Sequence, residues 1–179
     1  MAKDIEPKLK LISEYIALGK TDRFVIPEYQ RSYSWDIPRC DKLWQDIEDY
    51  IDTAPEDPYF FGTIISDCSN TNEFRLIDGQ QRTTTFLLLL KAILLRLDVV
   101  LSNLSRDDDS RALWRGLNNN REKIIELLYK ADDDKLVEIE KSWDAARGIV
   151  ILENMSINEQ FKDELTKILD RKSTRLNSS

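Results

Sequence analysis

The sequence predicts an α+β fold, with a small mixed β-sheet and helices followed by a helical region. One observation is the β-like run Glu73–Ile77, which ends in an Asp-Gly turn and leads into a very apolar helical stretch. A second is Arg23–Ile26, a short strand that Pro27 stops. A third is the change of character after Ser105, where polar turns alternate with helical patterns.

The first helix is predicted over Ile5–Leu18. Its apolar residues Leu9, Ile12 and Ile16 recur at helical spacing, and Gly19 is expected to cap its C-terminal end. The pattern therefore predicts one helix before the first strand.

The second helix is predicted to begin after Asp36, whose carboxylate can cap it, with Pro38 in its first turn. Its apolar side chains form one clean face: Cys40, Leu43, Trp44, Ile47, Tyr50 and Ile51. Such a face is typical of a helix that packs against a core.

A β-hairpin is predicted before the central helix. Tyr59–Ile65 is its β-rich first arm, Asp67–Asn72 its turn, and Glu73–Ile77 pairs back as the second arm. The helix after the glycine turn is apolar almost all round, and a helix of this kind is expected in the middle of a core. Its polar residues share one narrow stripe: Thr84, Lys91, Asp98 and Ser102.

The segment after Ser105 is predicted to be mainly helical. Two helical pieces, Arg111–Leu117 and Arg121–Lys130, are separated by the loop Asn118–Asn120 and preceded by the loop Arg106–Asp109. Further along, a short strand is expected at 136–139 and helices at 144–153 and 158–169.

The predicted organisation is a domain at 1–105 with its core at 23–95, a helical extension at 106–170, and a tail at 171–179. The tail is polar and without pattern, and it resembles the translation of a common sequencing adapter. We therefore exclude it from the fold as a non-native segment, and expect the extension to be truncated.

Composition excludes several classes of function. The 179 residues contain no histidine, which excludes imidazole bases, Ser-His-Asp triads and histidine-dependent nuclease sites on this chain. Cys40 and Cys68 show no metal-ligand spacing, so a reducing cytoplasm is expected. The net charge of −7 argues against broad binding of DNA backbone. Charges interrupt the longest apolar segment, 86–101, so no membrane span is expected.

The most specific candidate site is Asp78-Gly79 with the first residues of the following helix. A strand, a glycine turn and a helix start direct backbone N–H groups and the helix dipole toward an anion. Gly79 permits close approach of a phosphate, Arg82 can bind its oxygens, and Asp78 suits Mg²⁺. Gln80 and Gln81 can orient a water or the ligand. The alternative is a plain Asp-Gly turn, but so many polar residues beside an apolar helix favour a functional site.

A polar and aromatic stretch, 26–35, is the second candidate. Gln30 and Arg31 are predicted to contact the same ligand, and Tyr33 or Trp35 can stack on a base. The alternative is a loop whose aromatic rings simply anchor it to the core.

Gly62 is the third candidate feature. A glycine within a β-rich run indicates close approach of another backbone or a ligand, and a plain bulge is the equal alternative.

Three motifs follow one another in the front half: IPEYQRSYSW at 26–35, YFFGTII at 59–65 and LIDGQQRTTT at 76–85. In this order and spacing they resemble the N-terminal domain of GmrSD-type, modification-dependent restriction endonucleases, a ParB/sulfiredoxin-like family. The resemblance covers about residues 23–95, and the back half shares only its helical character.

The resemblance implies a regulatory domain that binds and hydrolyses a nucleoside triphosphate with Mg²⁺. In such anti-phage systems this domain is coupled to sensing of modified DNA and to a histidine-dependent nuclease domain or subunit, which this chain does not contain. The implied catalytic residues are Asp78, Gln81 and Arg82. The implied nucleotide-binding residues are Gln30, Arg31, Gly79, Gln80, Arg82 and Thr83, with Asp78 holding the metal.

Two other functions stay open at this point. In one, the domain is a non-catalytic sensing module in which nucleotide binding only switches contacts to DNA or to a partner domain. In the other, the same arginines bind the DNA backbone directly, which the acidic charge disfavours.

Overall fold

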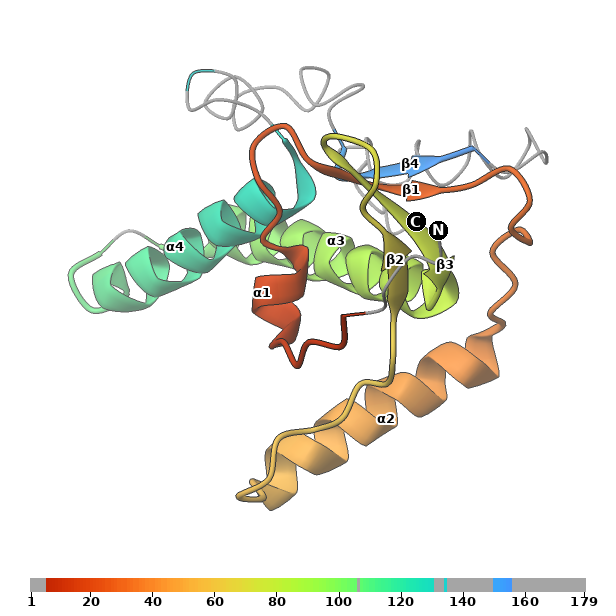
Figure 1. The fold of residues 1–179 in the computed structure, drawn as a ribbon. Helices are drawn as coiled ribbons and strands as arrows, with labels where there is room; N and C mark the ends of the chain where they lie inside the picture. Colours follow the sequence, from red (N-terminus) through yellow and green to blue (C-terminus); the bar gives the residue numbers. More distant parts are fainter. Residues whose placement is uncertain (1–5, 106, 131–133, 135–149, 156–179) are drawn as a thin grey trace.

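A computed structural model describes residues 6–105, 107–130, 134 and 150–155. Its helices and strands, in chain order, are α1 (Ile12–Ile16), β1 (Arg23–Ile26), α2 (Ile37–Thr53), β2 (Ile65–Asp67), β3 (Glu73–Asp78), α3 (Gln80–Asn103), α4 (Arg111–Leu128) and β4 (Leu152–Asn154) (Figure 1). The predicted α+β fold is confirmed.

The sheet has the strand order β2-β3-β1-β4. Strand β1 runs parallel to both β3 and β4, whereas β2 and β3 form the predicted antiparallel hairpin. Because β1, β3 and β4 are parallel, their carboxyl ends lie at one edge of the sheet. The loop after β1 and the turn after β3 therefore start from the same edge.

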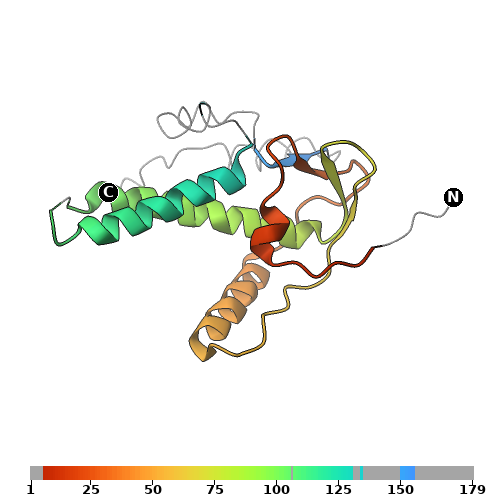
Figure 2. The same ribbon diagram turned by 60° about the vertical axis from the view of Figure 1, so that its left-hand side comes forward.

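The core lies between the sheet and helices α3 and α4, which run side by side (Figure 2). Its fully buried members come from both sides of residue 105: Phe24, Leu76, Leu87, Leu94, Ile125, Leu128 and Ile151. Segments from the front and back of the chain thus share one sheet and one core.

The sequence predicts that α3 is surrounded by the core on all sides. The structure differs from this prediction. Most of the polar stripe of α3 points inward: Lys91 is 1% exposed and donates a hydrogen bond to the Tyr129 hydroxyl, and Asp98 accepts one from Arg121 of α4 at 2.6 Å. Ser102, at the end of the stripe, is exposed. In contrast to Lys91, apolar Val99 is 40% exposed. The reason is that α4 covers only one side of α3 and presents polar partners to it.

The first helix is much shorter than predicted. Only Ile12–Ile16 is helical, because Ile12 and Ile16 pack on the core while Leu9 is 91% exposed. Short isolated helices are marginal in water, so residues without tertiary contacts do not extend the helix. Gly19 is not its cap, since Ala17 ends the helix and the Gly19 amide donates to the Asp22 carboxylate.

The first arm of the hairpin is also displaced. Strand β2 begins only at Ile65, so residues 59–64 are not a strand. The predicted turn and second arm are confirmed, with β3 one residue longer than expected.

Two predictions for the back half are wrong. Asn118–Asn120 is not a loop, because α4 continues through it and the Asn118 amide bonds Glu122 one turn ahead. Residues 150–153 are not helical either: Val150 bridges Tyr129, and β4 follows and pairs with β1. The strand predicted at 136–139 and the helix at 158–169 lie outside the described residues.

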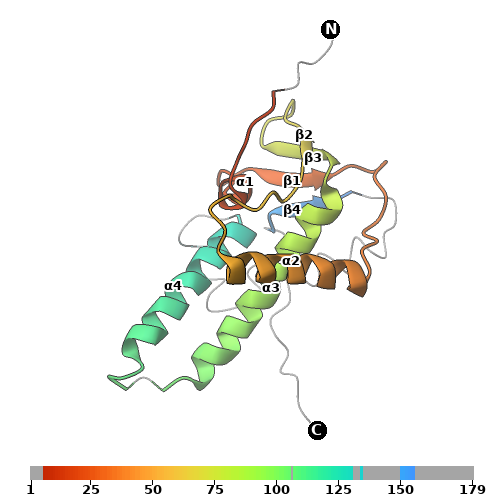
Figure 3. The same cartoon turned by 90° about the horizontal axis from the view of Figure 1, so that it is seen from below.

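Helix α2 projects from the body and crosses beneath α3 (Figure 3). Its predicted start is confirmed, since the Arg39 amide donates to the Asp36 carboxylate at 3.2 Å and Pro38 lies in the first turn. No residue of α2 is fully buried. Across the described part of the chain, no helix combines the length and apolarity that a membrane crossing requires.

Candidate functional site

The turn between β3 and α3 is built around Gly79. The strand ends at Asp78, and Gly79 caps the helix with φ = +85°, a conformation that residues with a side chain rarely adopt. A Cβ atom at this position would lie 2.8 Å from Cγ1 of Ile64 and 3.2 Å from its Cα. Glycine is therefore required here both by the backbone angle and by the close approach of Ile64.

Two glutamines at the start of α3 hold the loop that follows β1. The Gln80 amide donates to the side-chain oxygen of Gln30 at 3.0 Å and to the carbonyl of Arg31 at 3.1 Å. Gln81 accepts from the Ser34 amide at 2.8 Å and donates to the Ser32 carbonyl at 3.1 Å. Both glutamine side chains are buried, so these hydrogen bonds are partly shielded from water.

Gln30 also ties the loop to the end of β3. Its amide donates to the Ile77 carbonyl at 2.7 Å. The loop between β1 and α2 consequently runs beside the β3–α3 junction, as Figure 3 shows.

A cleft of about 400 Å³ lies between this loop and the glycine turn. It is lined by Gln30, Arg31, Trp35, Asp78, Gly79, Gln80, Gln81 and Arg82. The structure therefore brings the two predicted candidate segments together, including Trp35, which the sequence left open as either a ligand contact or an anchor. The volume falls within the range of about 300–1,000 Å³ usual for ligand sites.

The charged side chains of the cleft differ in whether they have hydrogen-bond partners within the protein. Arg31 and Asp78 are exposed, and the side chain of neither forms a hydrogen bond or ion pair with any residue in the described ranges. Arg82 is engaged: it donates to the carbonyls of Phe61 at 3.4 Å and Thr63 at 2.7 Å. Arg31 is thus the more available cation for an anionic ligand.

Gly62 allows Arg82 to take this position. A Cβ atom on Gly62 would lie 1.7 Å from a terminal nitrogen of the Arg82 guanidinium. The close approach that the sequence predicted is therefore real, but the approaching group is a side chain rather than a backbone or a ligand.

Thr83 does not line the cleft as the sequence predicted. Its hydroxyl is buried, donates to the Gly79 carbonyl and bonds the Tyr15 hydroxyl at 3.0 Å. A second pair, Tyr33 and Thr85, is joined at 2.9 Å. Burial raises the pKa of both tyrosines to about 12. Sequence reasoning missed these tyrosine–threonine pairs, because nothing in the local pattern links residues so far apart in the chain.

The cleft contains one carboxylate suited to a metal ion. Asp78 is its only acidic residue, and the described ranges hold no group of three or more acidic, cysteine or histidine side chains able to bind a metal. A dedicated protein cage for a metal is thus lacking in this part of the chain.

Comparison with known families was made for the whole sequence. The family described as "GmrSD restriction endonuclease, N-terminal domain" matches residues 11–178. The chain belongs to this family. No curated protein matches the sequence.

Membership of this family confirms the resemblance that the three motifs indicated. It also associates the chain with restriction and with DNA. In this GmrSD N-terminal domain the three motifs meet at or beside one cleft. The 26–35 motif forms one wall of the cleft and the 76–85 motif its base. The 59–65 motif is tied to that base by Arg82.

Proposed function

We propose that the cleft binds a nucleoside triphosphate together with Mg²⁺ and hydrolyses it slowly, as the regulatory step of a modification-dependent restriction system. The observation that supports this most is the convergence of Arg31, Arg82 and Asp78 at the start of a 24-residue helix. Segments almost 50 residues apart in the chain meet there, and the cleft carries net positive charge on an acidic protein.

The phosphates would lie over the Gly79 turn. Backbone N–H groups at the start of α3 have no intrahelical acceptor, and the helix dipole favours an anion at this end. Arg31 is free to donate two parallel hydrogen bonds to phosphate oxygens. Gly79 leaves the turn without a side chain that would block the approach.

The base would stack against Trp35, whose indole is the one large aromatic ring of the cleft. A stacking contact of this kind tolerates any base, so it does not define which nucleotide is preferred.

Asp78 would hold Mg²⁺. A single carboxylate that lacks other partners in the described structure fits this ion, which is usually bound by one or two carboxylates together with substrate phosphates. Bound Mg²⁺ would neutralise charge that develops on the phosphates.

Hydrolysis would depend on electrostatic stabilisation, since the chain has no histidine to act as a base. Arg31 and Arg82 would stabilise the transferred phosphoryl group. Gln80 and Gln81, which bond the loop through their amides, would act by positioning Arg31 and Trp35 rather than by orienting a water.

The role of the domain within a larger system is inferred from the family to which the chain belongs. We propose that nucleotide turnover here is coupled to recognition of modified DNA and to a histidine-dependent nuclease domain or subunit, within the cytoplasm. The match to the restriction endonuclease N-terminal domain supports this role.

The decisive experiment is calorimetric titration of Mg²⁺ with each nucleoside triphosphate into wild type and Arg31→Ala. The Arg31 side chain is exposed and has no partner in the described ranges, so the variant should keep its melting temperature. Losing a charge-assisted hydrogen bond of about 1.5–3 kcal/mol should weaken binding by about 10- to 100-fold.

Arg96→Ala is the matched control, because Arg96 is an exposed arginine about 24 Å further along α3. Phosphate release by wild type and Asp78→Ala then separates the enzyme from a non-catalytic sensor. Binding without phosphate release in wild type would favour the sensing module, and no binding of any nucleotide would refute the proposal.

A further inference from the structure

The segment 59–63 contacts Arg82, one of the residues that line the cleft, without being part of the sheet. In contrast to the turns around it, this segment has no hydrogen bond between its own backbone and the backbone of another described residue. Its Phe60 side chain is 71% exposed. Its position therefore depends on side-chain contacts.

Those contacts come from two places. At one end, Tyr59 packs edge-on against Tyr50 of α2, with ring centres 5.6 Å apart. At the other end, Phe61 packs against Phe86 of α3 at 5.5 Å, and Arg82 donates to the carbonyls on either side of Gly62. Arg82 is thus the polar tie between the segment and the base of the cleft.

The tie depends on Gly62. With φ = +104° and no side chain, Gly62 leaves the space that the guanidinium fills. Any larger residue would put its Cβ atom on the Arg82 nitrogen, which would have to move.

Arg82 is also one of the residues that line the cleft. Carbonyl oxygens are neutral acceptors, whereas a phosphate is charged and can accept two parallel hydrogen bonds from one guanidinium. An anion in the cleft therefore competes with the two carbonyls for Arg82.

We infer that Arg82 is a positioning residue that holds the segment 59–63, and that nucleotide phosphate takes Arg82 from the two carbonyls and releases the segment. This inference rests on the proposed nucleotide binding and adds how the site communicates with the exposed aromatic residues of the segment. Coupling of this kind is reciprocal, so freeing the segment also favours nucleotide binding.

The first test is limited digestion with chymotrypsin, with mass spectrometry to follow cleavage after Phe60 and Phe61. A non-hydrolysable triphosphate analogue with Mg²⁺ should raise the cleavage rate at these sites by about fivefold or more. Nucleotide binding with unchanged or slower cleavage would overturn the inference while leaving the proposed function intact. Failure of wild type to bind any nucleotide, measured by calorimetry, would refute both.

The second test uses Gly62→Ala, which displaces Arg82 but keeps its charge. Cleavage without nucleotide should rise to the rate of nucleotide-bound wild type, and nucleotide should not raise it further. Nucleotide affinity should be equal to or tighter than that of wild type. A large loss of affinity, or cleavage that still responds to nucleotide, would overturn the inference.

Gly116→Ala is the matched control, because a Cβ atom on Gly116 of α4 meets no atom within 4 Å. Arg82→Lys provides an independent variant if Gly62→Ala does not fold. A lysine ammonium lacks the planar fork that spans two carbonyls, so cleavage without nucleotide should rise there as well. A wild-type cleavage rate in Arg82→Lys would contradict the inference.

Discussion

The start of α3 and the whole of α2 differ in which kind of residue is buried. The first turns of α3 are polar, yet Gln80, Gln81, Thr83, Thr84 and Thr85 are all buried. Helix α2 has a clean apolar face, yet none of its residues is fully buried, and Ile51 is 65% exposed.

The difference teaches that a hydrophobic face predicts the orientation of a helix but not how much of it other segments cover. The start of α3 is covered because long-range hydrogen bonds fasten two loops onto it. Buried polar side chains that are hydrogen-bonded, as those of Gln80, Gln81, Thr83 and Thr85 are, hold a site in one geometry, which a binding cleft requires. Four predictions test this contrast.

Among these four predictions, the largest effect is expected for Gln81→Met. The variant keeps the side-chain volume but leaves the Ser34 amide and the Ser32 carbonyl without their partner. We expect the free energy of unfolding to fall by about 2–3 kcal/mol, measured by urea denaturation. Gln45→Met on exposed α2 is the control and should change stability by less than about 0.5 kcal/mol. Equal effects of the two changes would remove the contrast.

Tyr15→Phe should have a smaller effect, of about 1 kcal/mol at neutral pH, from loss of the hydrogen bond to Thr83. Burial raises the pKa of Tyr15 from 10.0 to about 12, so the folded protein resists its ionisation. The stability due to this group is present below pH 10 and is lost as the pH rises toward 12.

The alkaline part of this prediction is checked by thermal unfolding between pH 9 and about 12. Tyr15→Phe should lose less stability over that interval than wild type does. Tyr29→Phe is the control, because Tyr29 is 72% exposed, and it should follow wild type. A Tyr15→Phe curve parallel to wild type would contradict the assignment.

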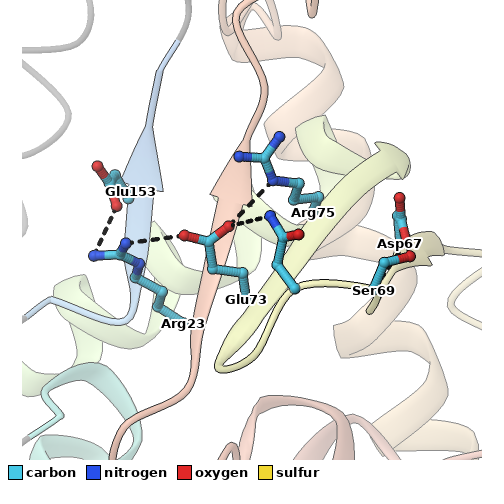
Figure 4. Close-up of polar contacts among 7 residues, drawn as sticks. Arg23, Asp67, Ser69, Glu73, Arg75 and Glu153 are labelled. Atoms are coloured by element: carbon cyan, nitrogen blue, oxygen red, sulfur yellow. Dashed lines mark hydrogen bonds and ion pairs between the residues drawn. The ribbon is translucent and has the colours of Figure 1, made fainter.

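A network of hydrogen bonds and ion pairs around Glu73 of β3 allows a similar test with charged side chains (Figure 4). Glu73 accepts hydrogen bonds from Asn70, Arg23 and Arg75, which lower its pKa from 4.5 to about 2. Arg23 also pairs with Glu153 of β4 at 2.9 Å, so the network joins three strands.

Because the folded pKa of Glu73 is lowered, its contribution is present above pH 4.5 and is lost as the pH falls toward 2. Glu73→Gln should therefore flatten the acid limb of the unfolding curve over that interval, measured by circular dichroism. Glu48→Gln on exposed α2 should leave the acid limb unchanged. An unaltered acid limb in Glu73→Gln would show that the network does not act on stability.

The smallest effect is expected for Ile51→Ser. The two residues have similar helix propensities, and Ile51 loses little apolar contact, so stability should change by no more than about 0.5 kcal/mol. Leu87→Ala in buried α3 gives the opposite reference, with an expected loss of about 2–5 kcal/mol. A loss above about 1 kcal/mol in Ile51→Ser would mean that the face of α2 is covered in solution.

Much of the fold was predictable where local chemistry decides it. Strand β1 has the predicted bounds because Pro27 stops it, and α2 begins where Asp36 can cap it. The candidate site was predictable as a set, since Arg31, Trp35 and the 78–82 turn do line one cleft.

The partners of individual side chains were not predictable. Thr83 is bonded to Tyr15 rather than exposed to the cleft, and Arg82 is bonded to two carbonyls of a segment that resembles a strand in sequence. Each of these contacts joins residues about 20 or more positions apart.

By itself, the sequence determined the α+β class, the glycine turn at the end of β3 and the family to which the chain belongs. These follow from turn chemistry, periodicity and motifs, which act over a few neighbouring residues. Only the tertiary structure decided that polar residues of α3 are buried and that the apolar face of α2 is only partly covered. It also decided that Arg82 is hydrogen-bonded, whereas the Arg31 side chain has no partner among the described residues. Burial and hydrogen-bond partners depend on which distant segments meet, and no local pattern contains that information.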